Sequence, residues 1–273
     1  GNNKFKSTQG QKTVKVGQAA QSITVTSLAP ASALVGDTYA PSASASSHLT
    51  VGVSVSGTCV LASGVVTFSA VGDCTVTYTQ AGNNKFAAAL SVSETITTGF
   101  ADQTITFAPT TAVTVGDSLV LSATSSLGAA YPVSLSASGV CVLVNNVVSF
   151  PVAGDCTLTA SQAGDAATNA ATSVVVTITA SQLDQSVTFA PTTTDTTVGG
   201  VVALNGGSTS GLGVTYSVDA SSTATCTVDK NGNVSATSAG TCVVNATQPG
   251  NNKFKSTQGQ KTCLLYTSPS PRD

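Results

Sequence analysis

A short motif recurs along this chain at a constant interval. It starts at Gln21, Gln103 and Gln185, and each copy alternates polar or hydroxyl residues with Ile, Val or Phe. The starts are 82 residues apart both times. A fixed period indicates that one structural unit is repeated, and about 80 residues are enough for each unit to bury a small core of its own. The chain is therefore expected to be a tandem array of small domains.

Three further landmarks follow each start in the same order: a Val-Gly turn, a pair of cysteines and a Gln-x-Gly turn. The Gln-x-Gly turns lie at 80–82, 162–164 and 248–250. The landmarks predict short connectors at 99–102 and 181–184 between successive repeats. The predicted organisation is a remnant of a preceding repeat at 1–20, repeats at 21–102, 103–184 and 185–262, and a tail at 263–273.

Both ends of the array are expected to be cut. Residues 1–13 are identical to residues 250–262, so they are interpreted as the end of a preceding repeat. Residues 263–273 break the repeat, contain the chain's only arginine and resemble the translation of a sequencing adapter. They are interpreted as an artefact rather than a genuine divergent tail. Cys263 is then not a native thiol, and the last strand of the third repeat is expected to be truncated.

The composition favours strands over helices and excludes several classes of function. Only 8% of the residues are charged, and the abundant Val and Thr, like Ile, suit a pleated, half-buried strand. The net charge is −2, and no Lys or Arg lies between Lys85 and Lys230, so no basic surface for nucleic acid is expected. No apolar run approaches the roughly 18 to 20 residues of a membrane span.

Within the second repeat, short alternating segments are separated by turn residues. Asn145-Asn146 predicts a tight hairpin turn, with counterparts at Ser63-Gly64 and Asn231-Gly232. Seven or eight short strands of this kind indicate a β-sandwich. The segments expected to be strands lie at 104–107, 119–123, 133–135, 141–143, 147–150, 156–160 and 173–179.

Six cysteines remain once Cys263 is set aside, two in each repeat. Six cysteines allow fifteen pairings, of which one pair per repeat is the simplest. A metal site would need four ligands with His or a CxxC spacing, and reduced core thiols are the other alternative. Disulfides would place the protein outside the cell or on its surface. The expected pairs are Cys59 with Cys74, Cys141 with Cys156 and Cys226 with Cys242, each joining one sheet to the other.

These features together resemble the bacterial immunoglobulin-like, or Big-type, repeats of large surface proteins. The features that match are the Gln-x-Ile/Val-Thr-Phe start, the Val-Gly-Asp turn, the Cys-x-Val hairpin, the Gly-x-Cys strand and the Gln-Ala-Gly-Asn turn. The resemblance implies tandem immunoglobulin-like β-sandwiches that act as spacers in adhesin-like proteins. The implied partners are neighbouring repeats and, through other domains, a host or matrix surface.

Residues that could support chemistry are few. His48 is the only histidine and occurs in one repeat, so a catalytic role is not expected. The turn acids Asp37, Asp73, Asp117 and Asp155 stand singly, whereas calcium needs six to eight oxygens. No enzyme activity, cofactor or metal is expected. The predicted function is a structural stalk; the alternative is a carbohydrate- or calcium-binding module on a larger secreted enzyme.

Overall fold

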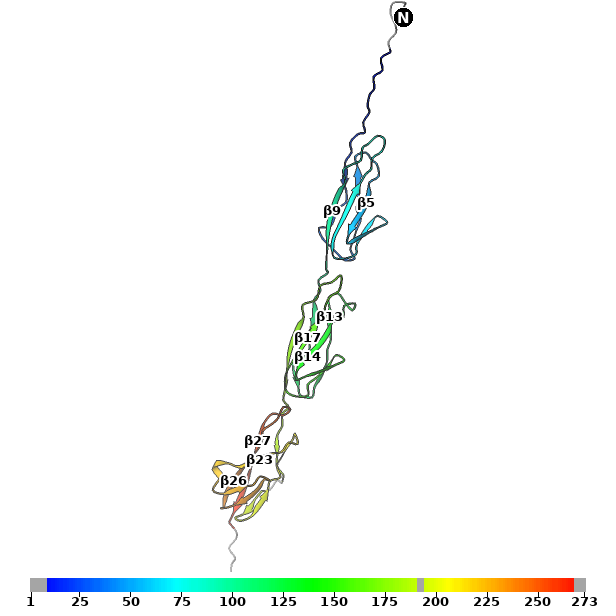
Figure 1. Ribbon diagram of the computed structural model, residues 1–273. Helices are drawn as coiled ribbons and strands as arrows, with labels where there is room; N and C mark the ends of the chain where they lie inside the picture. Colours follow the sequence, from blue (N-terminus) through cyan, green and yellow to red (C-terminus); the bar gives the residue numbers. More distant parts are fainter. Residues whose placement is uncertain (1–8, 191–193, 268–273) are drawn as a thin grey trace, which may run out of the picture. The chain divides into compact units, whose positions relative to one another are not determined.

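The computed structural model describes residues 9–190 and 194–267, and its regular secondary structure is almost entirely β-strand. Among these residues the only helical element is the short 3-10 helix η1 (Ala220–Ser222). Three successive sets of nine strand segments, β1–β9, β10–β18 and β19–β27, each form an immunoglobulin-like sandwich (Figure 1). The predicted all-β fold class is confirmed. In the part of the chain that is described, no helix is long and apolar enough to cross a membrane.

The contacts divide the chain into two compact units. One holds the first sandwich, up to residue 104, together with residues 162–172; the other holds residues 105–161 and the chain from 173 onward. The predicted repeat boundaries at 102, 184 and 262 stay predictions.

The first sandwich packs a four-stranded sheet of order β2–β9–β8–β5 against strands β1 with β4 and β3–β7–β6. Strand β2 runs parallel to β9, and all other pairs are antiparallel. The segments are β1 (Ile23–Val25), β2 (Ala33–Leu34), β3 (Thr38–Tyr39), β4 (Ala43–Ala45), β5 (Gly52–Gly57), β6 (Cys59–Ala62), β7 (Val65–Phe68), β8 (Gly72–Thr79) and β9 (Val92–Gly99).

Alternation of apolar and hydroxyl residues positions the core between the sheets. In β8 the side chains of Cys74, Val76 and Tyr78 are fully buried, while the threonines between them point outward. Successive side chains of a strand face opposite sides of its sheet, so this sequence produces one apolar face and one polar face. Phe68 and Ile96 complete the buried centre from β7 and β9.

The second sandwich repeats this topology. Its four-stranded sheet has the order β11–β18–β17–β14, and its other strands pair as β10 with β13 and as β12–β16–β15. Val148, Phe150, Leu158 and Ile178 are fully buried between the sheets. The segments are β10 (Ile105–Phe107), β11 (Val113–Thr114), β12 (Ser118–Val120), β13 (Ala123–Ser125), β14 (Ser134–Gly139), β15 (Val142–Val144), β16 (Val147–Ser149), β17 (Gly154–Ser161) and β18 (Val174–Ser181).

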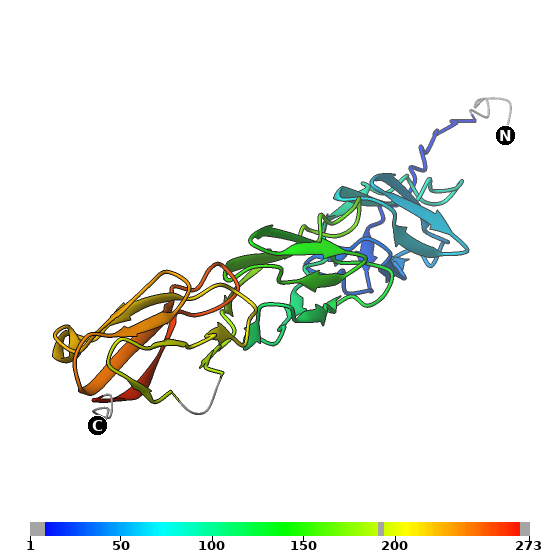
Figure 2. The same ribbon diagram turned by 90° about the horizontal axis from the view of Figure 1, so that it is seen from below.

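The third sandwich has the same arrangement, with sheets β20–β27–β26–β23 and β21–β25–β24 and the pair β19–β22. Figure 2 shows its last strand, red, beside the orange β26. The segments are β19 (Val187–Thr188), β20 (Thr196–Thr197), β21 (Val201–Ala203), β22 (Gly207–Ser208), β23 (Thr215–Val218), β24 (Cys226–Val228), β25 (Asn233–Ala236), β26 (Gly240–Gln248) and β27 (Thr257–Tyr266).

The last strand of the third sandwich is longer than the sequence predicted. A truncation at residue 262 was expected, but β27 continues to Tyr266. Cys263 and Leu265 face inward and are 0% and 3% exposed. Cys263 lies opposite Cys242, the position that Ile178 holds opposite Cys156 in the second sandwich. The tail happens to place apolar residues at the inward positions, so the alternation that specifies a strand is maintained.

One predicted hairpin turn also differs. Asn145 and Asn146 have φ values of 48° and 62°, as a two-residue type I′ turn requires, and Ser63-Gly64 behaves likewise. In the third repeat the hairpin instead closes through residues 229–232. The Asp229 carboxylate accepts backbone hydrogen bonds from Asn231 at 2.9 Å and Asn233 at 2.8 Å, which stabilises the longer loop. The prediction of a two-residue turn at Asn231-Gly232 is therefore wrong.

Candidate functional site

Each sandwich contains one disulfide between its sheets. Cys59 in β6 is bonded to Cys74 in β8, and the Cα atoms are 5.5 Å apart. Cys141, directly before β15, is bonded to Cys156, and Cys226 is bonded to Cys242. This is the pairing that the sequence predicted. The separation in the third repeat is 16 residues instead of 15, because its hairpin loop is longer.

A pair of glutamines holds the start of each sandwich to its last long loop, and sequence reasoning missed this role. In the first sandwich the Gln21 side-chain amide donates to Gln80 Oε1 at 2.6 Å and to the Ala87 carbonyl at 2.7 Å. The same Gln80 oxygen accepts from the Gly82 N–H at 2.5 Å. The signal was present in the sequence, because the first glutamine and the Gln-x-Gly turn recur together.

The other two sandwiches use the same network. Gln103 donates to Gln162 and to the Asn169 carbonyl. Gln185 donates to Gln248 and to the Lys255 carbonyl. Gln103 is only 7% exposed, so its side-chain amide needs these partners to offset the loss of water. The recurring glutamines are therefore structural.

The residues just before each sandwich pair with the same loop. Ala19 forms a parallel bridge with Phe86, Ala101 with Thr168, and Leu183 with Phe254. Two of these bridges lie in the predicted connectors. Near Leu183, Lys255 Nζ lies 2.8 Å from Asp184 Oδ1, an exposed ion pair that contributes little stability by itself.

The turn acids are hydrogen-bonded within their own turns and strands. Asp37 accepts from the Leu34 N–H at 2.9 Å, and Asp117 accepts from the Thr114 N–H at 2.7 Å. Asp73 and Asp155 accept from Thr hydroxyls of the neighbouring strand. Among the residues described, no three His, Cys, Asp or Glu side chains come together in a way that could hold a metal ion.

Three other acids show the same local use of charge. The Thr168 hydroxyl, followed by the Ala167 N–H, lowers the pKa of Asp165 below its usual value. The Ser221 hydroxyl lowers the pKa of Asp219, and the Asn233 N–H lowers the pKa of Asp229. Hydrogen bonds to the charged form cause each shift, so these carboxylates act as turn and cap acceptors.

His48 lies on the surface in a turn. Its side chain is exposed, its φ is 59°, and its backbone N–H donates to the Ala45 carbonyl at 2.9 Å. A His in this left-handed conformation is a turn residue. In the described part of the chain, no hydrogen bond joins the His48 side chain to a nucleophile or an acid.

A polar cluster inside the first sandwich was not predicted from the sequence. The hydroxyls of Tyr39 and Tyr78 donate to Glu94 Oε2 at 3.2 Å and 2.9 Å, and Ser27 contacts Tyr39 at 2.5 Å. Burial raises the pKa of Tyr78. Glu94 is the chain's only glutamate, which was the one available signal. The cluster does not recur in the other repeats, and it links both sheets of this sandwich.

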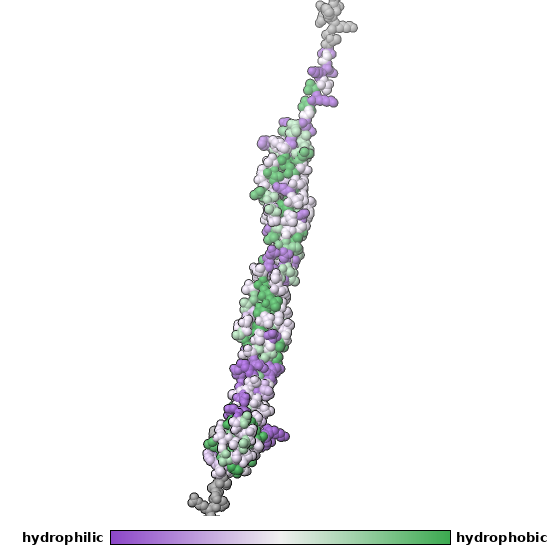
Figure 3. Space-filling view, turned by 90° about the vertical axis from the view of Figure 1, so that its left-hand side faces the viewer, coloured by the Kyte–Doolittle hydropathy of each residue, from purple (hydrophilic) through white to green (hydrophobic). Residues whose placement is uncertain are grey.

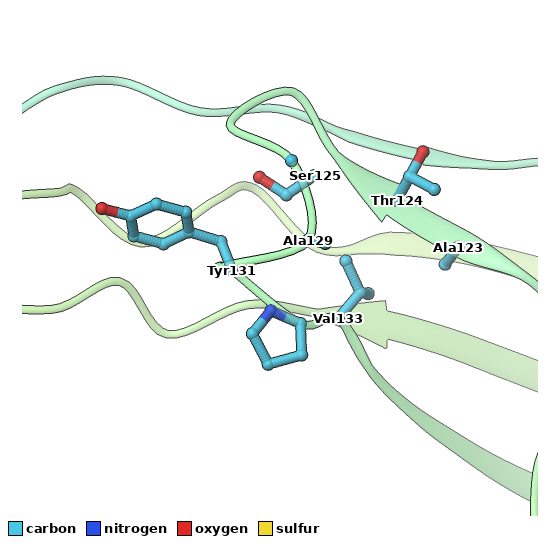
Figure 4. A pocket seen from close by; sticks show the side chains of 8 residues that line it. Ala123, Thr124, Ser125, Ala129, Tyr131 and Val133 are labelled. Atoms are coloured by element: carbon cyan, nitrogen blue, oxygen red, sulfur yellow. The ribbon is translucent and has the colours of Figure 1, made fainter.

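One surface pocket of about 270 Å³ lies in the second sandwich (Figure 4). Tyr131, Pro132 and Val133 form one side, and the end of β13 with Thr124 and Ser125 forms the other. Its lining is mainly apolar. The corresponding positions to Tyr131-Pro132 are Leu49-Thr50 and Leu212-Gly213, so the pocket is not a shared feature of the repeats.

Cys263 is the free cysteine of the described chain, and it is buried. Burial raises the pKa of its thiol, which disfavours the reactive thiolate.

We therefore expect a maleimide to leave Cys263 of the native protein unlabelled. In denaturant without reductant one thiol should react, and six more should react after reduction. Intact mass measures both numbers. Labelling of several thiols before reduction would contradict the three disulfides.

One face of the molecule carries few strongly hydrophilic residues. Figure 3 shows white and green residues covering most of the face in view, with purple residues gathered in a few bands. This agrees with a chain in which 8% of residues are charged. Such a surface provides no electrostatic field to attract a strongly charged ligand.

Comparison with known proteins gives structural likeness only. No family model and no curated protein matches this chain. Drosophila N-cadherin EC1-4 is 13% identical, with a TM-score of 0.28, and the match covers 91% of this chain and 76% of that chain. For Sidekick-1 immunoglobulin domains 1-5 the values are 12%, 0.29, 90% and 59%.

A third structure belongs to the same group of matches. It is the C-terminal 282-residue fragment of intimin in complex with the intimin-binding domain of the translocated intimin receptor. It is 14% identical, with a TM-score of 0.26, and the match covers 80% of this chain and 64% of that chain. TM-scores this low indicate nothing about function.

Proposed function

We propose that these repeats are non-catalytic structural stalk segments of an exported, adhesin-like bacterial surface protein. The proposal depends on one observation: the residues that recur in every repeat form bonds inside their own sandwich. The paired cysteines, the paired glutamines and the turn acids all bond within their own sandwich. Selection for a binding site would instead keep recurring polar side chains pointing outward in the same place. The disulfides fit an oxidising, extracellular location.

The strand order also suits a domain that bears tension. In each sandwich a strand near the N-terminal end runs parallel to the last strand: β2 with β9, β11 with β18, and β20 with β27. Pulling the two ends of the chain apart loads the hydrogen bonds between parallel strands along the strand direction. These bonds must then break together, rather than one after another as in a peeled antiparallel hairpin. Each disulfide also prevents extension of the chain between its cysteines.

Single-molecule force spectroscopy on the full chain tests the proposal. We expect one unfolding event per repeat. After reduction, the gain in contour length at each event should be larger than in the oxidised chain by about 50 Å, because the roughly 15 residues between the cysteines are then released as well, at roughly 3.3–3.6 Å each. Val115→Pro removes the N–H that donates to the Ser181 carbonyl at 3.0 Å beside the β11–β18 pair. It should lower the force of one event and leave the other two unchanged.

The rival function, a carbohydrate-binding module, has one observation in its favour, the pocket beside Tyr131. An aromatic ring beside hydroxyl groups is a suitable platform for a sugar ring. A glycan array on the full chain decides between the two. Binding that Tyr131→Ala abolishes, together with peeling at low force in the pulling experiment, would replace the stalk proposal. A calcium-dependent rise in melting temperature would favour the calcium alternative.

A further inference from the structure

A row of exposed valines crosses one sheet of the second sandwich and ends at an edge strand. Strand β15 is the last strand of the sheet β12–β16–β15 and has a single neighbour, β16. On the outer face of this sheet Val144 lies opposite Val147, and Val147 lies opposite Val120. These side chains are 60%, 38% and 82% exposed, and Val142 on the same face is 52% exposed. We call these four residues the valine row.

Nothing in the sequence of this hairpin protects its edge. Natural sheets block an exposed edge with Lys, Pro, inward-pointing charges or bulges. The segment 141–149 contains no charged residue and no proline. The first sandwich has a smaller version of the row, with Val60 57% exposed and Val65 38% exposed. In the third, Asp229 and Lys230 follow β24 directly and supply the missing charges.

The backbone of β15 is oriented for pairing at its centre. Val144 and Val147 flank the two-residue turn and form the hydrogen-bonded pair that closes the hairpin. Hydrogen-bonded and non-hydrogen-bonded pairs alternate along an antiparallel ladder. The N–H and C=O of Leu143 therefore point away from β16, toward the open edge. The Leu143 side chain packs on the core and does not obstruct this edge.

We propose that β15 is a self-association edge, where a second copy of this chain adds its own β15 antiparallel across a two-fold axis. With Leu143 opposite Leu143 of the copy, each donates its N–H to the carbonyl of the other. Val142 then lies beside Val144 of the copy in a non-hydrogen-bonded pair, where side chains are closest. The two valine rows join into one apolar stripe across a six-stranded sheet.

A second copy fits this edge better than an unrelated partner. An antiparallel edge pairs with itself about a two-fold axis, so Val142 and Val144 of β15 meet the same valines of the copy, and the outward N–H of Leu143 meets the outward carbonyl of its counterpart. The repeat has four aspartates and no Lys, Arg or Glu between residues 103 and 184. Two copies therefore repel one another weakly, and the attraction must come from apolar contact and backbone hydrogen bonds.

The size of the edge sets the strength of the association. One short strand and four valines bury far less than the roughly 1,200 Å² of a specific stable interface, so a Kd on the order of 0.1–1 mM is expected. Association of this strength matters where many copies are held on one surface, since tethering raises the effective concentration and a second edge in the first repeat can add to it.

Sedimentation equilibrium of the full chain over a concentration series tests the proposal. We expect a reversible dimer, and Val144→Lys should weaken it by at least about tenfold, since a charge would be buried at the centre of the contact. Val175→Lys is the matched control. Val175 is 59% exposed on β18, in the other sheet of the same sandwich, and it takes no part in the valine row, so the control should dimerise like the parent chain. Added salt should strengthen the dimer, because it screens the repulsion between aspartates.

Four outcomes would overturn the proposal. The first is a chain that stays monomeric throughout the series. The second is an equal effect of Val144→Lys and Val175→Lys, which would indicate a general effect of charge. The third is weakening by salt, which would indicate ion pairing. The fourth is a dimer whose mass persists in denaturant without reductant, which would indicate a covalent link through Cys263. Melting temperatures of both variants near that of the parent chain show that the fold is intact.

Discussion

Replacing Gly139 by alanine is expected to destabilise the second sandwich by about 3 kcal/mol or more. Gly139 ends β14, lies opposite Cys156 and has a φ of 96°. A Cβ placed there would lie 2.2 Å from the Asp155 carbonyl oxygen. Relief of that contact requires β14 and β17 to separate next to the disulfide, where Cys156 is fully buried. The Gly154-Asp155-Cys156 segment therefore leaves no space for a side chain at position 139, which must be glycine.

Gly128→Ala is the matched control for this prediction. Gly128 has a similar φ of 86°, but its added Cβ meets no atom within 4 Å. It should lose only the cost of a left-handed alanine, about 1 kcal/mol. Hydrogen exchange of peptides from residues 103–184 measures both local stabilities. Equal losses in the two variants would show that backbone conformation, and not the contact with Asp155, sets the requirement for glycine.

Removal of the second disulfide should have an effect of similar size. The double variant Cys141→Ala and Cys156→Ala opens a loop of 15 residues, for which chain entropy predicts a loss of about 3 kcal/mol. Lost packing adds to this, because Cys156 is fully buried. A domain of about 80 residues has a small core and little stability in reserve. We therefore expect the second sandwich to unfold well before the others.

Local hydrogen exchange again provides the measurement. Protection should fall in peptides from 105–161 and remain in peptides from 21–99, whose disulfide is intact. Calorimetry should show one transition moving to lower temperature. If protection falls equally in the first sandwich, the repeats do not unfold independently. If protection is unchanged everywhere, the disulfide does not stabilise the native state through its closed loop.

Periodicity predicted much of the fold because it reports burial directly. The second repeat shows this well: Cys156, Leu158 and Ala160 were expected on one face, and all three are fully buried. The turn at Asn145-Asn146 was equally predictable, because few residues tolerate a positive φ at two successive positions. The disulfide pairs followed from the two cysteines in each repeat.

Features that depend on long-range contacts were harder to predict. The network of Gln103 with Gln162 joins residues 59 positions apart, and neither glutamine by itself signals its partner. The loop at Asp229 was misjudged because Asn231-Gly232 is a strong hairpin signal locally. The Asp229 side chain favours the longer loop over the two-residue turn, because it accepts hydrogen bonds from two backbone N–H groups. The Tyr39–Tyr78–Glu94 cluster likewise exists only where two sheets meet.

The segment that occurs twice separates the two kinds of information most clearly. Residues 9–13 are identical to 258–262. The second copy lies in β27, paired along its length with β26, whereas the first forms no strand, and Val14 and Val16 beyond it are 74% and 91% exposed. The sequence by itself determined the alternation and the cysteine pairs of each repeat, and the hairpin turns of the first two. Tertiary structure decided which copy became a strand, because a strand is stable only where a neighbour supplies hydrogen bonds and a core buries its apolar face.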